Sequence, residues 1–549
     1  MIVLGPVIGK VTGTSARILI EVESSMAVTC SLSTAEHGGV SRTKTFTAGR
    51  PGVFVFTGLT PCTHYSVAFD APTNTKEPLS CSFTTLPTVW TLEARPPRIA
   101  VVSCNKIWTT HKDVEPSGDL WGDLEQRVKE RSVDYLLHIG DNIYADSDLY
   151  LIEGHKRDFQ GPDDECRFAV AKKLIEDKPR DQWVNEYENM CEIFRDVYRL
   201  TWGHPPTRRV LANIPNLMIL DDHEIRDDWG DTDEHRDPKN PDHYVAMAAY
   251  QCYNEYQRQL YEDFTLHEVP MPNYPPMLPP QPAPHCAYHF HSFGEVGFLF
   301  LDLRACKTFH WNDKTDKDLP HMGAAQWDAL REALGEGGTF DGCRFVLVLA
   351  SVPVAYLSHT VNQLAVKVVN DLNGSWTATD HLKETEEFLK LLFAWRRNRP
   401  DGHREVTIVG GDVHEGGMTE IVDTTVGVSR GSTRPASARL KQMTSSAIAN
   451  KRLPWYQAAA PTLARELSAR LPGHYSFDHF GWVQDRNYGL LSAFIDTMST
   501  SAGGNGQCVD YDLQLVSSDG KKVTEHEAIN RMTDPKTVDK GCCGGCSVQ

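Results

Sequence analysis

Four predicted strands of this chain end directly in residues with acidic, thiol or imidazole side chains. They are Ile99–Val102 before Ser103-Cys104-Asn105, Asp134–Ile139 before Gly140-Asp141, Leu217–Leu220 before Asp221-Asp222-His223-Glu224, and Val406–Val409 before Gly410-Gly411-Asp412-Val413-His414. Apolar runs of this length are typical of buried strands and are too short for helices. Open α/β sheets bind ligands at the carboxyl ends of their strands. The pattern therefore predicts an α/β fold with a ligand site built from strand ends.

We expect one parallel sheet to bring these four strand ends together. Tyr144, three residues after Asp141, is placed to reach the same point. Each element alone has an ordinary alternative, because a Gly-Asp pair is common turn chemistry and a single histidine is often a hydrogen-bonded core residue. Several carboxylates at one point would repel each other, however, and bound cations would relieve that repulsion. The sequence therefore predicts a metal site.

The order of elements divides the chain into three parts. Residues 1–90 alternate apolar and polar positions, as at Ile18, Ile20 and Val22, which indicates an all-β domain. Its segment Gly58–Tyr65 resembles the corner of a fibronectin type III sandwich, where a tyrosine hydroxyl ties the turn. From 97 to 500, strands alternate with amphipathic helices, which indicates a layered α/β domain. The remaining predictions are helices at 119–131, 243–263, 323–334 and 380–397, a helical insertion at 148–215, a proline-rich loop at 269–284 and a flexible tail at 501–549.

The composition of the chain disfavours some classes of binding partner. The 549 residues carry a formal net charge of −18, which disfavours nucleic acid and anionic lipid as general partners. The segment Met1–Pro6 lacks the basic region and apolar core of a secretory signal. We therefore expect an intracellular protein, with its 14 cysteines mostly reduced and some available as ligands.

Taken together, the motifs resemble the alkaline phosphatase D (PhoD-like) family of the metallophosphoesterase superfamily. The matching motifs are Ser-Cys-Asn at 103–105, Gly-Asp-Asn-Ile-Tyr at 140–144, Asp-Asp-His-Glu at 221–224 and Gly-Asp-Val-His at 411–414. Weaker matches are 301–304, 444–446 and 486–489. The resemblance implies a metallophosphoesterase-type layered β-sheet core with flanking helices over residues 97–500, preceded by the small sandwich.

By this resemblance, one metal would be held by four side chains, namely Cys104, Asp141, Tyr144 and His414. A thiolate, a phenolate and an imidazole suit iron, expected here as Fe³⁺, better than magnesium or calcium. Many members of the superfamily carry an Asp-x-His motif at the first strand end. This chain has Cys104 there instead, as PhoD-like proteins do.

The second metal site implied by the resemblance offers only oxygen ligands. Asp141 would bridge to it, and Asp222 and Asp412 would complete it, with Asp221 as a further donor. The histidines usual in the superfamily are absent here, and Ala350-Ser351-Val352-Pro353 stands where another would be expected. Oxygen ligands favour a hard cation such as Ca²⁺. The roles of Asp227 and Asp228, which stand where the family tends to have asparagine, stay open.

The resemblance implies hydrolysis of phosphodiesters or phosphomonoesters by a hydroxide that bridges the two metals. His223 would protonate the leaving oxygen or stabilise charge on the transferring phosphoryl group, and Asn105 and Arg304 would hold phosphate oxygens. An ordinary salt bridge is an equal alternative for Arg304. Two other functions stay open, a phosphomonoesterase of small metabolites or phosphoproteins and a lipid-anchored interaction protein with a structural metal site.

The last residues carry a separate signal. Cys546-Ser547-Val548-Gln549 fits a C-a-a-X box, whose final glutamine favours farnesylation of the cysteine. One lipid chain anchors weakly, and Cys542 and Cys543 are placed for palmitoylation as a second signal. We therefore expect the protein at the cytosolic face of a membrane. The alternative is a flexible tail that ends this way by chance.

Overall fold

The computed structural model of the chain describes fourteen segments of the sequence. They are residues 1–35, 38–73, 80–107, 119–146, 166–237, 239–263, 287–307, 320–366, 370–399, 404–426, 435–450, 470–496, 508–518 and 522–524. The predicted loop at 269–284 and the cysteines Cys542, Cys543 and Cys546 lie outside these residues. Within the described part of the chain, no helix combines the length and the apolar character needed to cross a bilayer.

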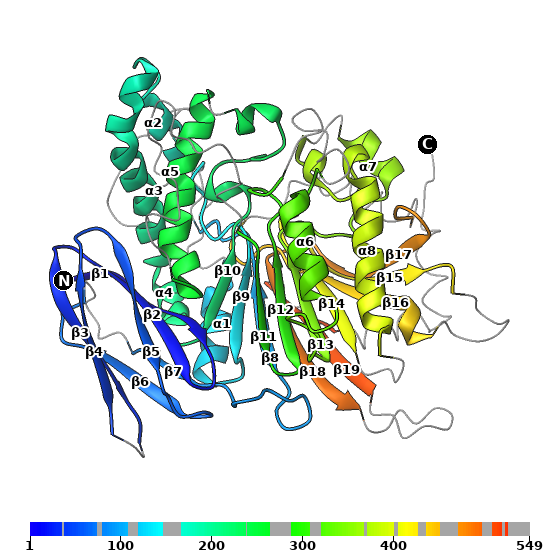
Figure 1. Cartoon of the computed structure of the whole chain (residues 1–549), viewed down its shortest axis with the longest axis horizontal. Coiled ribbons are helices and arrows are strands. Elements are labelled where there is room, and N and C mark those ends of the chain that lie inside the picture. The colour runs from blue at the N-terminus through cyan, green and yellow to red at the C-terminus, as the bar shows by residue number, and fades with distance from the viewer. Residues whose placement is uncertain are drawn as a thin grey trace, which may run out of the picture.

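Residues 1–84 form two antiparallel sheets (Figure 1). One sheet contains β1 (Ile2–Val11), β2 (Ser15–Val22) and β5 (Pro51–Thr57), and the other contains β4 (Val40–Phe46), β3 (Met26–Ser33), β6 (His64–Phe69) and β7 (Ser82–Thr84), each in spatial order. The two sheets share one apolar core, to which Ile18 and Val28 belong. At the predicted corner, the Tyr65 hydroxyl accepts the Thr60 backbone N–H at 2.9 Å. This is the contact that the sequence predicted for the turn.

The larger domain contains two further sheets. The first, in spatial order, is β10 (Asn216–Ile219), β9 (Tyr135–Ile139), β8 (Arg98–Val102), β18 (Asn487–Asp496), β19 (Cys508–Ser517) and β20 (Lys522–Thr524). The second is β11 (His289–Phe293), β12 (Val296–Leu301), β13 (Phe345–Ala350), β14 (Glu405–Gly410), β16 (Arg439–Thr444), β15 (Gly416–Asp423) and β17 (Tyr475–Val483). In each sheet the strands that precede the predicted motifs run parallel, and antiparallel strands extend the sheet outward.

The helices cover the sheets from the outside. They are α1 (Trp121–Lys129), α2 (Arg167–Lys173), α3 (Tyr187–Trp202), α4 (Pro205–Leu211), α5 (Pro241–Tyr256), α6 (Gly323–Ala333), α7 (His359–Ala365) and α8 (Leu382–Arg397). Short 3-10 helices are η1 (Arg180–Glu186), η2 (Asp222–Glu224), η3 (Asp233–Arg236), η4 (Arg258–Leu260), η5 (Asn370–Gly374), η6 (Thr379–His381) and η7 (Ala436–Ala438). In Figure 1, α3, α4 and α5 stand beside the N-terminal sheets, and α6 and α8 lie over the seven-stranded sheet.

Alternate side chains along the strands build the layers. In β13, Leu347 belongs to the core that also contains Val101 and Leu137 of the six-stranded sheet. Its neighbour Val346 belongs to the core formed with α6 and α8. Successive strand residues point to opposite faces of a sheet, so one face of the seven-stranded sheet packs on the other sheet and one on helices. The predicted layered β-sheet core with flanking helices is therefore present as a mixed α/β fold.

Two expectations about the layout were wrong. The four motif-bearing strands do not share one sheet, because β8, β9 and β10 belong to the six-stranded sheet and β14 belongs to the seven-stranded sheet. The predicted tail at 501–549 also contains ordered structure, since β19 pairs with β18 along its whole length. In β19, Leu513 and Leu515 pack into the inter-sheet core. The alternation of such apolar residues with polar ones was the sequence signal for a strand here.

Buried polar contacts fix the N-terminal sheets to the larger domain. The Tyr135 hydroxyl of β9 accepts the Val11 N–H at 2.7 Å and donates to the Val11 carbonyl at 2.7 Å. The fully buried carboxylate of Glu21 accepts from Arg199 of α3 and from the Tyr256 hydroxyl of α5. Buried polar groups are costly without partners, so these pairs hold the two domains in one arrangement.

The ends of β9 and β10 are locked together by Glu224. Its buried carboxylate accepts the backbone N–H groups of Asp141, Asn142 and Asp221 at 3.2, 2.8 and 2.8 Å. Gly140 permits this approach, because its φ is +101° and a Cβ there would meet the Cβ of Asp221 at 2.5 Å. Glu224 therefore sets the distance between two of the predicted motifs.

We predict that Glu224→Ala lowers the free energy of unfolding by at least about 3 kcal/mol, because three buried N–H groups lose their acceptor. Denaturant unfolding of the purified protein measures the change. Glu387→Ala on the outer face of α8, where the glutamate is half exposed, is the matched control and should change stability by less than about 0.5 kcal/mol. Equal stability of the two variants would contradict the assigned role of Glu224.

Candidate metal centre

Four potential ligands converge where the ends of β8, β9 and β14 meet. The Cys104 thiol, an Asp141 carboxylate oxygen and a His414 ring nitrogen lie within 4.8 Å of one another. The Tyr144 hydroxyl donates to Asp141 Oδ2 at 3.0 Å and lies 3.4 Å from His414 Nε2. Cys104, Asp141 and Tyr144 are at most 1% exposed. The structure thus brings together the four residues predicted for the first metal.

The second predicted group is also assembled. Carboxylate oxygens of Asp221, Asp222 and Asp412 lie within 4.8 Å of one another, and Asp141 and Asp222 form a further group with His223. Ser351, at the position where the superfamily histidine is absent, donates its hydroxyl to Asp221 Oδ1 at 2.9 Å. Asp141 and Asp222 each belong to two of the three groups, and the role of Asp141 as a bridge between two metals stays a prediction.

Arg304 lies against this second group. Its guanidinium is 2.5 Å from Asp221 Oδ1, 3.3 Å from Asp412 Oδ1 and 3.6 Å from Asp222 Oδ2. A further contact joins it to Asp231 at 3.7 Å. Arg304 forms the salt bridges of the ordinary alternative, and these same salt bridges hold its positive charge beside the candidate centre, where a phosphate contact would need it.

Four of these residues have an energetically unfavourable backbone conformation. Cys104, Asp141, Asp412 and His414 have φ values of 51°, 53°, 64° and 54°. This left-handed region is unfavourable for residues other than glycine, at about 1–3 kcal/mol each. Strained backbone at the ends of β8, β9 and β14 is typical of a functional site that the surrounding fold over-determines.

Several buried oxygens at the centre have no partner among the residues that the structure describes. They are Asp141 Oδ1, Asp221 Oδ2 and Asp222 Oδ1. A buried carboxylate oxygen that accepts no hydrogen bond is costly, and a cation in contact with it would remove that cost. The donor set therefore fits bound metal ions.

The pKa shifts of Asp141, Cys104 and His414 are consistent with a cation bound between them. Burial raises the pKa of Asp141 to about 6, and burial together with the charge of Asp141 raises the pKa of the Cys104 thiol well above its ordinary value. Burial lowers the pKa of His414 to about 3, which keeps the imidazole neutral as ligation requires. A nearby cation would reverse the penalty on the thiolate and the carboxylate.

His223 lies at the edge of the centre and is oriented by Asp146. Its Nδ1 is 2.8 and 2.9 Å from the Asp146 carboxylate oxygens, and its ring packs against Tyr144 with 4.2 Å between centroids and a tilt of 31°. Burial alone lowers the pKa of His223, but the charges of Asp146, Asp141 and Asp222 outweigh it and raise the pKa well above its ordinary value. The ring is therefore held ready to donate a proton from Nε2.

Three supporting residues were not among the predicted site residues. Ser446 Oγ lies 2.9 Å from Cys104 Sγ, and Asn487 holds the segment around Ser446 through contacts of 2.6 and 3.1 Å. Asn450 Nδ2 donates to the Tyr144 hydroxyl at 3.1 Å and lies 2.8 Å from His414 Nε2. The weak motifs at 444–446 and 486–489 were the signal for two of them, whereas Asn450 lay in no motif.

Other predicted residues have different surroundings. The Asn105 side chain accepts from Trp121 Nε1 at 2.8 Å and donates to the Asn142 carbonyl at 3.3 Å, so its amide is used within the protein. The backbone N–H groups of Asp227 and Asp228 donate to Asp146 and Asp222 at 2.7 and 2.8 Å. These contacts make Asn105 a support for the ends of β8 and β9, and they place Asp227 and Asp228 around the centre.

Comparison with known proteins gives a family match and a structural match. The profile of PhoD-like phosphatases matches residues 99–487. A solved structure described as "Structure of PhoD" aligns over 95% of this chain and 92% of its own, with 14% identity and a TM-score of 0.58. A complex of a Paenibacillus cycloisomaltooligosaccharide glucanotransferase covers 74% of this chain and 45% of its own at 12% identity, and its TM-score of 0.16 carries no argument. A search of curated proteins found no significant sequence match.

The profile match spans well over half of the chain and includes all four strand-end motifs. The solved structure shares the fold, and its low identity supports nothing beyond the fold. Members of the matched family are phosphoric ester hydrolases that use metal ions, and the groups of candidate ligands described above agree with this. The chain belongs to the PhoD-like phosphatase family.

Proposed function

We propose that the protein hydrolyses phosphodiesters, phosphomonoesters or both at a dinuclear metal centre. The observation that carries the proposal is the convergence of unpartnered, buried oxygens of Asp141, Asp221 and Asp222 beside Cys104 and His414. Burying these oxygens costs free energy in the absence of cations, and with cations bound the same arrangement can support hydrolysis. The membership of the chain in the PhoD-like family supports hydrolysis of a phosphoric ester.

We assign iron to the group of Cys104, Asp141, Tyr144 and His414. Soft and borderline donors outnumber carboxylates there, which favours a transition metal. For the group of Asp141, Asp222 and Asp412, with Asp221 adjacent, we propose a hard cation such as Ca²⁺, because its donors are oxygens.

When bound, cations at such a centre neutralise the charge of the phosphate and activate water for attack. The rest of the chemistry belongs to side chains of this chain. Asp146 fixes the His223 ring through Nδ1, so that Nε2 carries the proton for the leaving oxygen. Arg304 holds positive charge beside Asp221 and Asp412, where it stabilises negative charge on the phosphoryl group.

An activity screen on purified protein tests the reaction class. Bis-p-nitrophenyl phosphate and p-nitrophenyl phosphate, with iron and calcium supplied, separate diesterase from monoesterase activity. Turnover of either ester that a chelator abolishes is the expected result. Full metal occupancy without turnover of any phosphate ester would favour the alternative, an interaction protein with a structural metal site.

For His223→Ala we predict unchanged metal content and turnover reduced by roughly 10²–10⁴-fold, the usual contribution of a general acid or base. Metal analysis and steady-state kinetics on the same preparation measure both quantities. His479→Ala is a matched control, because that half-buried histidine bonds to Thr419 and the Tyr356 carbonyl instead. If His223→Ala loses its metal together with activity, His223 is a ligand, as its grouping with Asp141 and Asp222 would permit.

The iron assignment predicts a coloured protein. Ferric iron bound by phenolate or thiolate absorbs visible light through charge transfer, whereas zinc, magnesium and calcium give no such band. Tyr144→Phe and Cys104→Ser should each shift or bleach the band, because each removes one of these donors. Tyr356→Phe, in a different cluster, is the control and should leave the spectrum unchanged. Colourless, active protein that contains zinc or magnesium without iron would overturn the assignment.

A lipid anchor stays a prediction from the sequence, since residues 525–549 lie outside the described part of the chain. If Cys546 is prenylated in a eukaryotic cell, the mass of the C-terminal peptide increases and the protein sediments with membranes. Cys546→Ser should then shift the protein to the soluble fraction and leave hydrolysis of a soluble ester unchanged. An unmodified wild-type peptide would reject the anchor without affecting the proposed reaction.

A further inference from the structure

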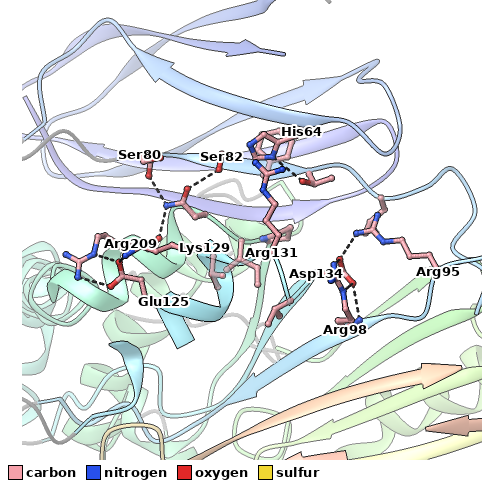
Figure 2. A pocket seen from close by; sticks show the side chains of 18 residues that line it. His64, Ser80, Ser82, Arg95, Arg98, Glu125, Lys129, Arg131, Asp134 and Arg209 are labelled. Atoms are coloured by element: carbon pink, nitrogen blue, oxygen red, sulfur yellow. Dashed lines mark hydrogen bonds and ion pairs between the residues drawn. The ribbon is translucent and has the colours of Figure 1, made fainter. Parts of the chain in front are cut away.

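A cavity lies between the N-terminal sheets and the larger domain (Figure 2). Its volume is about 520 Å³, which is in the range of cavities that bind small molecules. One wall is formed by β6, β7 and the residues beside them, and the other by α1, the end of α4 and the starts of β8 and β9. The wall residue Arg98 begins β8, whereas Cys104 follows the end of that strand. The cavity is therefore about 15–20 Å from the metal centre, one strand length away.

The charge of this cavity is opposite to that of the protein. Five basic side chains and two acidic ones line it, which leaves an excess of three positive charges in a chain with a net charge of −18. The seven residues are Arg95, Arg98, Lys129, Arg131, Arg209, Glu125 and Asp134. We call this space the cationic cavity. Like charges gathered in a cavity repel one another and favour the entry of an anion.

The two acidic side chains hold four of the basic ones in place. Asp134 accepts from Arg95 at 2.5 Å and from Arg98 at 2.7 and 3.0 Å. Its side chain is only 3% exposed, whereas that of Arg98 is 45% exposed. Glu125, 8% exposed, accepts both arms of Arg209 at 2.7 and 2.8 Å. The carboxylates are thus buried anchors, and the basic groups keep exposed surface for a ligand.

Lys129 and Arg131 carry two further positive charges of the lining. Lys129 shares Glu125 with Arg209 and is 63% exposed. Arg131 follows α1 and is exposed, and its guanidinium forms no hydrogen bond or ion pair within the described residues, whereas its backbone N–H donates to the Val128 carbonyl at 3.0 Å. Its side chain extends toward His64 of β6 in Figure 2. Arg131 also has a φ of 53°, a conformation in which glycine would be less strained, so the position bears a cost for a charged side chain.

Apolar groups complete the lining. Phe83 and Leu86 on the side of the N-terminal sheets and Val133 and Ile214 on the other side line the same cavity. All four side chains are at most 9% exposed, so they add little apolar surface to the cavity. The volume of about 520 Å³ is larger than an inorganic ion needs and admits an organic molecule that carries several negative charges.

We propose that the cationic cavity is a binding site for a small organic anion that carries two or more negative charges. Its negative charges lie against Arg131, Lys129 and Arg98, and the rest of the molecule lies between the two walls of the cavity. The site is separate from the metal centre, and it stands or falls independently of the proposed hydrolysis.

Binding of pyranine, a fluorescent pyrene that carries three sulfonates, tests the site by fluorescence anisotropy. Sulfonates are not phosphate esters, so the probe is not hydrolysed. Arg131→Gln should raise the Kd about tenfold or more, since it removes a charged donor. Lys129→Gln should also weaken binding, and Glu125 keeps both arms of Arg209 in that variant. Arg42→Gln, on the opposite edge strand of the same sheet as β7, removes the same charge from an exposed site and should leave the Kd unchanged.

Each arm of the experiment decides between outcomes. A Kd that rises for Arg131→Gln and Lys129→Gln and stays unchanged for Arg42→Gln and Asp141→Ala supports the site. Binding lost only in Asp141→Ala would place the probe at the metal centre and overturn the proposal. Absence of saturable binding to the wild type, or equal weakening by Arg42→Gln, would overturn it as well, since attraction would then be absent or nonspecific.

Discussion

The cost of burying three carboxylates side by side is the constraint on which the rest of the structure depends. Asp141, Asp221 and Asp222 are each at most 4% exposed, and each has an oxygen without a partner among the described residues. Burial and the neighbouring carboxylates raise the pKa of Asp141 to about 6 and that of Asp222 well above its ordinary value. Arg304 offsets part of this cost, and the oxygens that Arg304 leaves unpaired define where cations would be bound.

Backbone hydrogen bonds between loops bring the two sheets together at this point. The Cys104 N–H donates to the Gly140 carbonyl, and the Ile448 and Asn450 N–H groups donate to the carbonyls of Ser103 and Cys104. The segment after β16 therefore reaches across from the seven-stranded sheet to the end of β8. The strained φ values at the ligand positions persist because such contacts, together with Glu224, hold the loops on both sides.

The sequence was most informative where chemistry follows directly after a strand. Cys104, Asp141 and His414 each do so, and the structure places all three in one group. The assignment of their strands to one sheet was wrong. A buried parallel strand has the same sequence pattern in either of two facing sheets, so the pattern does not show which sheet contains it. Asn450 and Asp146 make contacts that depend on the packing of distant loops, and no periodicity or motif spacing encodes such contacts. The tail prediction failed at 508–517 because a late strand can add to a sheet whose other strands come from far earlier in the chain.

The metal centre and the cationic cavity lie at opposite ends of the same strands. The carboxyl ends of β8 and β9 present Cys104 and Asp141, whereas Arg98 and Asp134 stand at their amino ends. The cavity needs both domains, since β7 supplies Phe83 and the larger domain supplies the charges. Its shape is fixed in advance by buried contacts such as those between Tyr135 and Val11, so little ordering is required of a ligand that enters. The N-terminal domain thus has a physical role as one wall of a preformed site, while the strand-end chemistry stays in the larger domain.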